Sequence, residues 1–185
     1  MRSLGLIGAP ESGRDLIAAL LSMIGYTRYS FEDLVREEIT SVRKSKPKWP
    51  ERCPLSRFTY LDSSGAWAAW HTQDLWAFPI SDPIQTLLHW WDRARNKKDP
   101  SHWTALMDKK IRSREESKRT LRVWPDVRRE SEAQWVRQQG GRIWLVVGPK
   151  HSTQKPEYLN IVPDSTIISS GGLHEVVERI RGLIK

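Results

Sequence analysis

The amino-acid sequence predicts an α/β protein, with a central, mostly parallel five-stranded sheet and helices on both of its faces. The first observation is that short apolar runs alternate along the chain with longer segments of helical periodicity. The run at residues 142–147 is apolar almost throughout, as a parallel strand that is buried on both faces requires. The second observation is the segment at residues 14–24, whose apolar residues recur at i, i+3, i+4 and i+7. Strands that alternate with helices in this way pair in parallel through crossover connections.

Length and composition favour one soluble globular domain spanning residues 1–185. The chain has 38% hydrophobic and 28% charged residues, which is typical of this class. No apolar run approaches the roughly 20 residues that cross a bilayer, and the N-terminus does not resemble a signal peptide. We therefore expect no membrane partner and a cytoplasmic location. The only cysteine, Cys53, excludes an internal disulfide and agrees with that location.

Charge and aromatic content indicate anionic partners without choosing among them. The net charge of +8 suits nucleotides, nucleic acid or an acidic protein surface. Six of the ten tryptophans lie between residues 67 and 103. We expect most tryptophans to fill the core, with base stacking as the alternative role for individual rings. The histidines show no metal-ligand spacing, and no helix-turn-helix, zinc or bZIP pattern is present, so a specific DNA-binding protein is the least favoured class.

The first strand, at residues 4–8, runs into a glycine-rich loop that opens the first helix. Gly8 and Gly13 are separated by four residues and followed by Arg14 and Asp15. Glycines allow close approach of the backbone, and the N–H groups of such a loop and of a helix N-terminus bind anions. A complete phosphate loop has Lys and then Ser or Thr after its second glycine. We therefore predict a phosphate site with Arg14 in the lysine position; the alternative is an ordinary turn that contains two glycines.

The first half of the chain continues with a second strand at residues 26–31 and a helix that carries Leu34, Val35, Ile39 and Val42 on one face. Residues 45–80 have no firm periodicity and are interpreted as an irregular insertion, with a weak hairpin signal between residues 57 and 70. Two further helices begin at the cap signals Asp82-Pro83 and Asp99-Pro100.

The second half is predicted to contain a strand at residues 121–124, a helix with Ala133 and Val136 inward, the strand at 142–147, a polar loop at 148–163, a strand at 165–168 and a final helix from residue 173. Pro125 ends the first of these strands, and Asp126 follows it. Ligands of parallel sheets bind at the carboxyl ends of the strands. The loop at residues 8–15 and Asp126 should therefore lie at the same edge of the sheet.

Several of these stretches together resemble the bacteriophage deoxynucleoside monophosphate kinases, a branch of the P-loop nucleotide kinases. The loop from Gly8 to Asp15 resembles the family's Gly-x4-Gly-Lys-Asp. The most specific stretch is Trp124-Pro-Asp-Val-Arg-Arg-Glu-Ser-Glu-Ala133, which resembles a strand followed by Pro-Asp-Val-Arg-x-x-Asn-Glu-Ala. Further resemblances lie at residues 30–36, 87–103 and 164–173, the last of which is similar to the element beside the adenine in that family.

The resemblance implies a three-layer P-loop kinase-like fold and transfer of the ATP γ-phosphoryl to a deoxynucleoside 5′-monophosphate, with Mg²⁺, in deoxynucleotide metabolism. Its site residues carry over as follows. Gly8, Ser12, Gly13, Arg14 and Asp15 would bind the ATP phosphates, and Asp15 would organise the metal directly or through water. Arg14, Asp126 and Arg128 would be catalytic.

The acceptor nucleotide would be bound by Asp126, Arg128, Arg93 and Arg95, the last two as phosphate clamps. Glu132 is either a helix-surface residue or, at i+4, a partner of Arg128 that helps to bind the acceptor. Residues 148–163 resemble a lid, for which Lys150 and Lys155 are the candidate cations. The basic cluster at residues 109–119 is either a solvated face or a further wall over the phosphates.

The sequence departs from the family at several phosphate-handling positions. Arg14 replaces the loop lysine, Ser131 stands in place of Asn, Asp92-Arg93-Ala94 replaces a Gly-Thr-Asp/Glu piece, and Gly148-Pro149-Lys150 replaces the Arg-Pro-Gly of the lid. Arginine and lysine are not interchangeable at a tight site. Two functions therefore remain: a working kinase, or a kinase fold without catalysis that binds a host or phage protein, or nucleic acid, through its basic, tryptophan-rich middle. The sequence leaves a monomer and a homodimer equally open.

Overall fold

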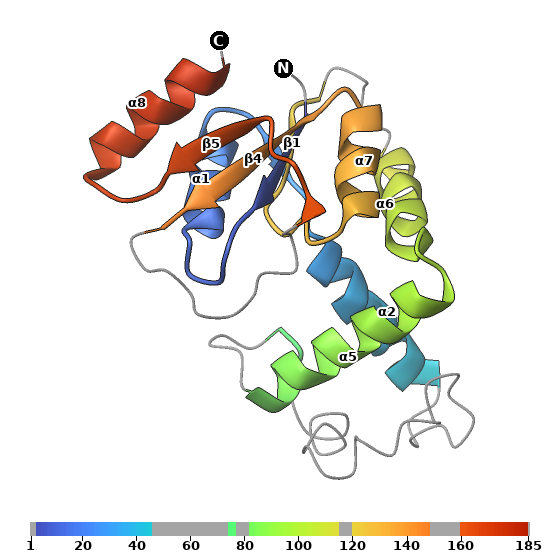
Figure 1. The fold of residues 1–185 in the computed structure, drawn as a ribbon. Helices are drawn as coiled ribbons and strands as arrows, with labels where there is room; N and C mark the ends of the chain where they lie inside the picture. Colours follow the sequence, from blue (N-terminus) through green and yellow to red (C-terminus); the bar gives the residue numbers. More distant parts are fainter. Residues whose placement is uncertain (1–2, 46–73, 77–81, 115–119, 149–159, 185) are drawn as a thin grey trace. The chain divides into compact units, whose positions relative to one another are not determined.

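A computed structural model describes residues 3–45, 74–76, 82–114, 120–148 and 160–184 (Figure 1). The lid candidates Lys150 and Lys155 and the weak hairpin at residues 57–70 lie outside these ranges. The chain divides into two compact units. Residues 1–31 and 104–185 make up one, called here the sheet unit, and residues 32–103 make up the other, called the helical unit. The single-domain organisation stays a prediction. None of the helices in the described ranges is long and apolar enough to cross a membrane.

The sheet unit is built on a five-stranded parallel sheet with the strand order β2-β3-β1-β4-β5. All four pairings between neighbouring strands are parallel, which confirms the predicted fold class (Figure 1). Because β1 is the central strand, the loop that follows it emerges in the middle of the carboxyl edge. The strands are β1 (Ser3–Ile7), β2 (Thr27–Arg28), β3 (Arg122–Trp124), β4 (Arg142–Val147) and β5 (Ser165–Ile168).

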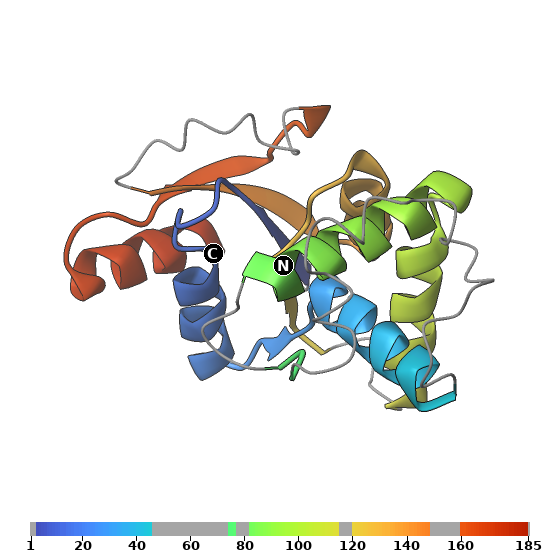
Figure 2. The same ribbon diagram turned by 90° about the horizontal axis from the view of Figure 1, so that it is seen from below.

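Helices cover both faces of this sheet. On one face, Leu4 and Leu6 of β1 join a buried cluster with residues of α1 (Arg14–Met23) and α8 (Leu173–Ile184). On the other face, Gly5 lies under α7 (Glu130–Gln138), and a Cβ added there would lie 3.5 Å from Val136 Cγ1. Figure 2 shows α1 and α7 on opposite sides of the strands. The alternation along β1 thus produces the predicted three layers.

Tryptophans fill much of the interior, as predicted. Trp124 packs edge-on against Trp135 with ring centroids 5.2 Å apart, and Tyr29 stacks on Trp124 at 6.3 Å. The Trp135 indole N–H donates to Asp108 Oδ1 of α6 (His102–Ser113) at 3.2 Å. The buried indoles are Trp91, Trp103, Trp124, Trp135 and Trp144, whereas Trp76 is 51% exposed.

In the helical unit, Glu38 connects three helices. It lies on α2 (Phe31–Ser45), and its Oε1 accepts hydrogen bonds from Trp91 Nε1 at 3.0 Å and Arg95 Nε at 2.5 Å, both on α5 (Asp82–Lys98). Its Oε2 lies 2.6 Å from His102 Nε2 at the start of α6. The predicted apolar face of α5 is buried, with Ile84, Leu87, Leu88 and Trp91 all at or below 2% exposure.

The second strand is shorter than predicted, because a long-range contact ends it. Residues 26–31 were expected to be extended, but β2 covers only Thr27–Arg28. Tyr26 is buried in the core cluster, where burial raises the pKa of its phenol. Beyond the strand, the Ser30 hydroxyl bonds to Asp126, and α2 begins at Phe31.

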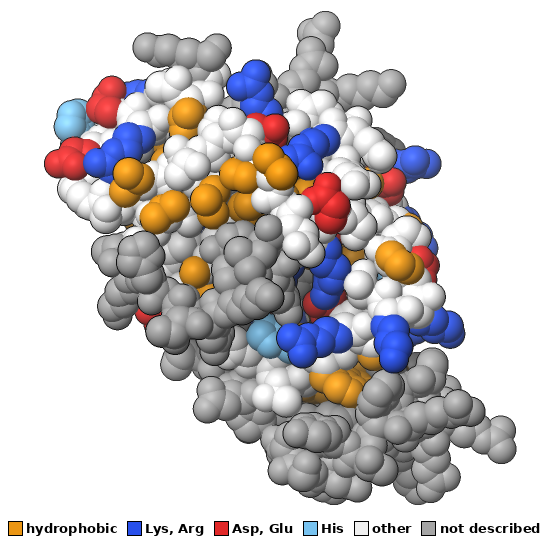
Figure 3. All heavy atoms as spheres, in the orientation of Figure 1, with side chains coloured by type: hydrophobic (Ala, Val, Ile, Leu, Met, Phe, Trp, Pro, Cys, Tyr) orange, Lys and Arg blue, Asp and Glu red, His pale blue; other side chains and the backbone are white. Residues whose placement is uncertain are grey.

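Apolar side chains are exposed along the outer strand of the sheet. Ile168 is 48% exposed and Leu173 is 60% exposed. Figure 3 shows apolar atoms gathered over β4 and β5 beside α8. Within α8, the buried residues are Val176 and Ile180.

Candidate functional site

The predicted phosphate loop connects a fully buried strand to an open helix N-terminus. Strand β1 ends at Ile7, and α1 begins at Arg14. Gly13, at the N-cap, has φ 90° and ψ 15°, a left-handed conformation that glycine adopts without strain. Glycine has no side chain that could cap the helix, and no side-chain cap bond is recorded at this N-cap among the described residues. The N-terminal N–H groups of a helix have no partner within the helix itself. Such groups and the helix dipole favour an anion at this place.

The ends of β4 and β5 hold the loop in its conformation. Ser169, which directly follows β5, donates its hydroxyl to the Ser12 carbonyl at 2.5 Å and its N–H to the Val147 carbonyl at 2.9 Å. A Cβ added to Gly13 would lie 2.8 Å from Ser169 Oγ, and one added to Gly148 would lie 2.7 Å from Ser12 Cα. These glycines permit the close packing of the loop against its two neighbouring strands.

Ser12 places an unpaired hydroxyl inside the loop. Its side chain is only 2% exposed, and its Oγ has no hydrogen-bond partner among the described residues. A Cβ added to Gly8 would lie 2.5 Å from this oxygen, so Gly8 leaves the space that the hydroxyl fills. A buried hydroxyl without a partner costs free energy. A phosphate oxygen bound in the loop would supply the missing partner.

We expect the change Ser169→Ala to weaken nucleotide binding by several fold and to lower the free energy of unfolding by about 1 kcal/mol. The change removes the donor to the Ser12 carbonyl and frees the loop from β5. Calorimetric titration with ATP and urea unfolding measure the two effects. The matched control is Ser113→Ala, which removes another hydroxyl-to-carbonyl bond, 2.8 Å long, at the end of α6. Equal ATP affinities of the two variants would contradict the clamping role of Ser169.

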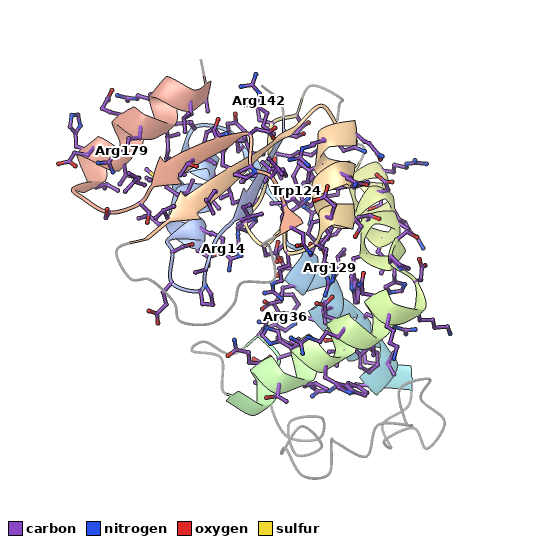
Figure 4. All side chains as sticks on the ribbon, viewed as in Figure 1. Arg14, Arg36, Trp124, Arg129, Arg142 and Arg179 are labelled. Atoms are coloured by element: carbon purple, nitrogen blue, oxygen red, sulfur yellow. The ribbon has the colours of Figure 1, made fainter. Side chains whose placement is uncertain are left out.

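Charged side chains surround the start of α1. Arg14 is half-buried in its first turn, on the side of the sheet where the strands end (Figure 4). Asp15 is 85% exposed, and its Oδ1 accepts a hydrogen bond from Arg28 Nη2 at 3.0 Å. The described ranges contain no group of three or more acidic, His or Cys side chains that could hold a metal. Mg²⁺ is often bound through one or two carboxylates with waters and substrate phosphates, so the metal role of Asp15 stays a prediction.

Asp126 lies after β3, as predicted, and contacts the start of α2. Its Oδ2 accepts from the Ser30 hydroxyl at 2.7 Å, and its Oδ1 accepts from the Phe31 N–H at 3.1 Å. The side chain is buried, with the residue 9% exposed. A carboxylate at a helix N-terminus satisfies free N–H groups and interacts favourably with the dipole. Asp126 therefore caps α2, and its catalytic role stays a prediction.

The change Asp126→Asn is expected to lower the free energy of unfolding by about 1–2 kcal/mol, because one of the two accepting oxygens becomes an amide group that faces a donor. Urea unfolding measures this change. Ser30→Ala, which removes one of the same bonds, should lower stability in the same direction. A stable Asp126→Asn protein that has lost turnover would instead assign Asp126 to the chemistry.

Glu132 is an interior residue rather than a helix-surface one. It is 2% exposed, and its Oε2 accepts from the N–H groups of Arg128 at 2.8 Å and Arg129 at 3.2 Å. Its Oε1 accepts from Arg129 Nη1 at 2.8 Å. The contact with residue 128 thus runs through the backbone, and the bonded guanidinium is that of Arg129. The missed signal was the position of Glu132 at N3 of α7, where a glutamate reaches back to the N-cap.

The predicted phosphate-binding residues lie together in the loop of the sheet unit, whereas Arg93 and Arg95 belong to the helical unit. Arg93 is exposed on α5. Arg95 is bonded to Glu38, and its guanidinium lies 5.6 Å from the ring centroid of Trp91. Their acceptor-binding roles stay predictions. Sequence reasoning also missed Arg28, which lies in the middle of the predicted second strand at residues 26–31 but is the last residue of β2 in the structure.

Comparison with known proteins supports the fold and leaves the activity open. No protein-family model matches the chain, and neither does any curated protein. The crystal structure of TT1252 from Thermus thermophilus matches with a TM-score of 0.53 and 17% identity, covering 99% of this chain and 95% of that one. Dephospho-CoA kinase from Campylobacter jejuni matches with a TM-score of 0.47 and 10% identity, with the same coverage. At 17% identity the likeness to TT1252 concerns the fold alone.

Proposed function

We propose that the protein is a nucleotide kinase that transfers the γ-phosphoryl group of Mg-ATP to a deoxynucleoside 5′-monophosphate. The observation that carries this proposal is the loop between Gly8 and Gly13, which joins a buried central strand to a helix N-terminus that has no side-chain cap among the described residues. The buried hydroxyl of Ser12 within that loop, which has no hydrogen-bond partner in the described part of the chain, adds to it. The choice of acceptor rests on the resemblance of residues 124–133 to the phage kinases.

Phosphoryl transfer depends mainly on positioning and on neutralising charge, and the sheet unit has groups for both. The loop N–H groups and Arg14 would hold the β- and γ-phosphates. Asp15 would hold Mg²⁺ directly or through water, and the ion would supply positive charge that neutralises the phosphates. Asp126 and Arg128 follow the strand next to β1 and would define the acceptor side.

The strand order indicates how ATP and the acceptor would lie along the carboxyl edge of the sheet. Strands β4 and β5 flank β1 on one side, and β3 and β2 flank it on the other. Residues 164–173 resemble the element beside the adenine, so the donor base would lie at the β5 side. The terminal phosphate would then point toward β3 and β2, where the acceptor would bind.

The second candidate is a kinase fold that has lost catalysis and acts as a binding module for a protein or a nucleic acid. This candidate is favoured because the acidic side chains at the site already form hydrogen bonds or ion pairs within the protein. Asp15 is paired with Arg28, Asp126 caps α2, and Glu132 accepts three hydrogen bonds. In that case the same residues would stabilise the fold without acting on a nucleotide.

A coupled assay for ADP release separates the two candidates. The purified chain is incubated with Mg-ATP and each of the four deoxynucleoside monophosphates, alongside the variant Arg14→Lys, which restores the lysine of a complete phosphate loop. The kinase predicts acceptor-dependent turnover with at least one nucleotide. Absence of turnover in both folded proteins would refute the kinase and favour the binding module.

A further inference from the structure

A second guanidinium lies at the edge of the sheet where the phosphate loop emerges. Arg28 is the last residue of β2, which pairs in parallel with β3. Its register partner on β3 is Val123, which also pairs with Leu4 of β1, so the backbone of Arg28 lies level with Leu4 and its side chain extends toward the carboxyl edge of the sheet. Its Nη2 donates to Asp15 Oδ1 at 3.0 Å, and Asp15 is the second residue of α1. The pair therefore joins the end of β2 to the first turn of the loop's helix.

This pair leaves Arg28 available for a stronger partner. The two side chains are 47% and 85% exposed, and ion pairs with such exposure contribute little to stability. Among the described residues, Asp15 is the only recorded bonding partner of Arg28. A phosphate carries more negative charge than a carboxylate and accepts two hydrogen bonds from one guanidinium. Arg28 can thus exchange the carboxylate for a phosphate, or contact both.

An independent feature of the same loop points to an anion there. Ser12 Oγ is buried and has no partner among the described residues, so the loop already contains a polar group that lacks its ligand. Arg28 lies on the β2 side of β1, whereas Ser169 and Gly148, which clamp the loop, follow strands on the opposite side. The donor orientation proposed above turns the terminal phosphate toward the β2 side.

We propose that Arg28 binds the γ-phosphate of ATP and that Asp15 is the positioning residue that holds its guanidinium at this place. The inference rests on the proposed function, because it names a further phosphate contact of the same site. It divides the positive charge between two guanidinium groups: Arg14, at the end of the loop, and Arg28, at the end of the edge strand β2, which β3 separates from β1. A γ-phosphate contact predicts that Arg28 discriminates ATP from ADP.

The test compares the dissociation constants of Mg-ATP and Mg-ADP, measured by calorimetry, for the full chain and for the variants Arg28→Gln, Arg28→Lys and Arg181→Gln. We expect Arg28→Gln to weaken ATP binding by about tenfold or more, the loss typical of one charge-assisted hydrogen bond, and to change ADP binding by less than about twofold. Arg28→Lys, which keeps the charge without the planar fork, should lie between the two. Arg181→Gln removes an equally exposed surface pair with Glu178 on α8 and should leave both constants unchanged.

Each outcome decides between the proposals. Equal effects of Arg28→Gln on ATP and ADP, or no effect on either, would overturn the γ-phosphate contact while leaving the kinase proposal in place. A selective loss of ATP affinity in a protein without turnover would support the contact and refute the kinase. An unmodified chain that binds neither nucleotide would overturn both. Circular dichroism of each variant confirms that the compared proteins are folded.

Discussion

Replacing Arg14 with glutamine is expected to lower kcat by about a hundredfold or more, because one preorganised positive group that faces the developing charge contributes an effect of that size. Arg14 is the first residue of α1, directly after the left-handed Gly13, and is half-buried beside the open helix N-terminus. Glutamine is a good helix former, so we expect the free energy of unfolding to change by less than about 1 kcal/mol. Steady-state kinetics and urea unfolding measure the two quantities.

The matched control for Arg14→Gln is Arg142→Gln. Arg142 is the exposed first residue of β4, at the opposite end of the strands from Arg14 (Figure 4). Both changes remove one positive charge, but only Arg14 faces the loop, so Arg142→Gln should keep normal kinetics. Wild-type kcat in Arg14→Gln would exclude Arg14 from the transition state. A higher KM for ATP with unchanged kcat would limit its role to binding the ground state.

The change Glu132→Gln is expected to lower the free energy of unfolding by about 3 kcal/mol. The carboxylate is almost fully buried and accepts from two backbone N–H groups and from the guanidinium of Arg129. An amide provides one accepting oxygen only, so at least one of these donors would face an NH2 group. The side chain of Arg129 is 17% exposed and would keep its charge without its counter-ion. Urea unfolding gives the value directly.

A surface pair of similar geometry provides the comparison for Glu132. Glu175 pairs with Arg179 at 3.2 Å on α8, and its side chain is 61% exposed. Glu175→Gln should change stability by less than about 0.5 kcal/mol, because exposed helical pairs contribute little. If Glu132→Gln were equally harmless but raised the KM of the acceptor nucleotide, Glu132 would be a binding residue rather than a structural one.

Local patterns were sufficient for most of the fold. Strands β4 and β5 have the bounds that the sequence predicts, because a short apolar run between glycine or proline signals has few alternatives. Helix α1 was also predictable, from its periodicity and from Gly25, whose φ of 99° confirms it as the residue that ends the helix. The second strand was overextended, because the signal that stops it is the long-range bond from Ser30 to Asp126.

The candidate site could be predicted only where its signal is local. Gly8, Gly13 and Arg14 follow from one spacing pattern. The bonds from Ser169 to Ser12 and from Ser30 to Asp126 join residues 157 and 96 positions apart, and no periodicity reports such pairs. The same holds for Arg95, whose anchor, Glu38, lies 57 positions away. The sequence therefore identified Asp126 and Arg95 as charged candidates, but not the residues that bond to them.

The bond between Ser169 and Ser12 also bears on the order in which the chain can fold during synthesis. The glycine loop and β1 are synthesised well before both neighbours of β1 and the strand that clamps its loop, all of which come from residues 122–168. Long-range parallel pairings of this kind form slowly, because a large part of the chain must be ordered before they contribute. The apolar central strand therefore has no strand to pair with until residues 122–147 have been translated. During that interval it can aggregate or be bound by chaperones. Slower translation before β5 would prolong this vulnerable state, whereas rapid completion of the last two strands would fix the glycine loop against β5 and end it.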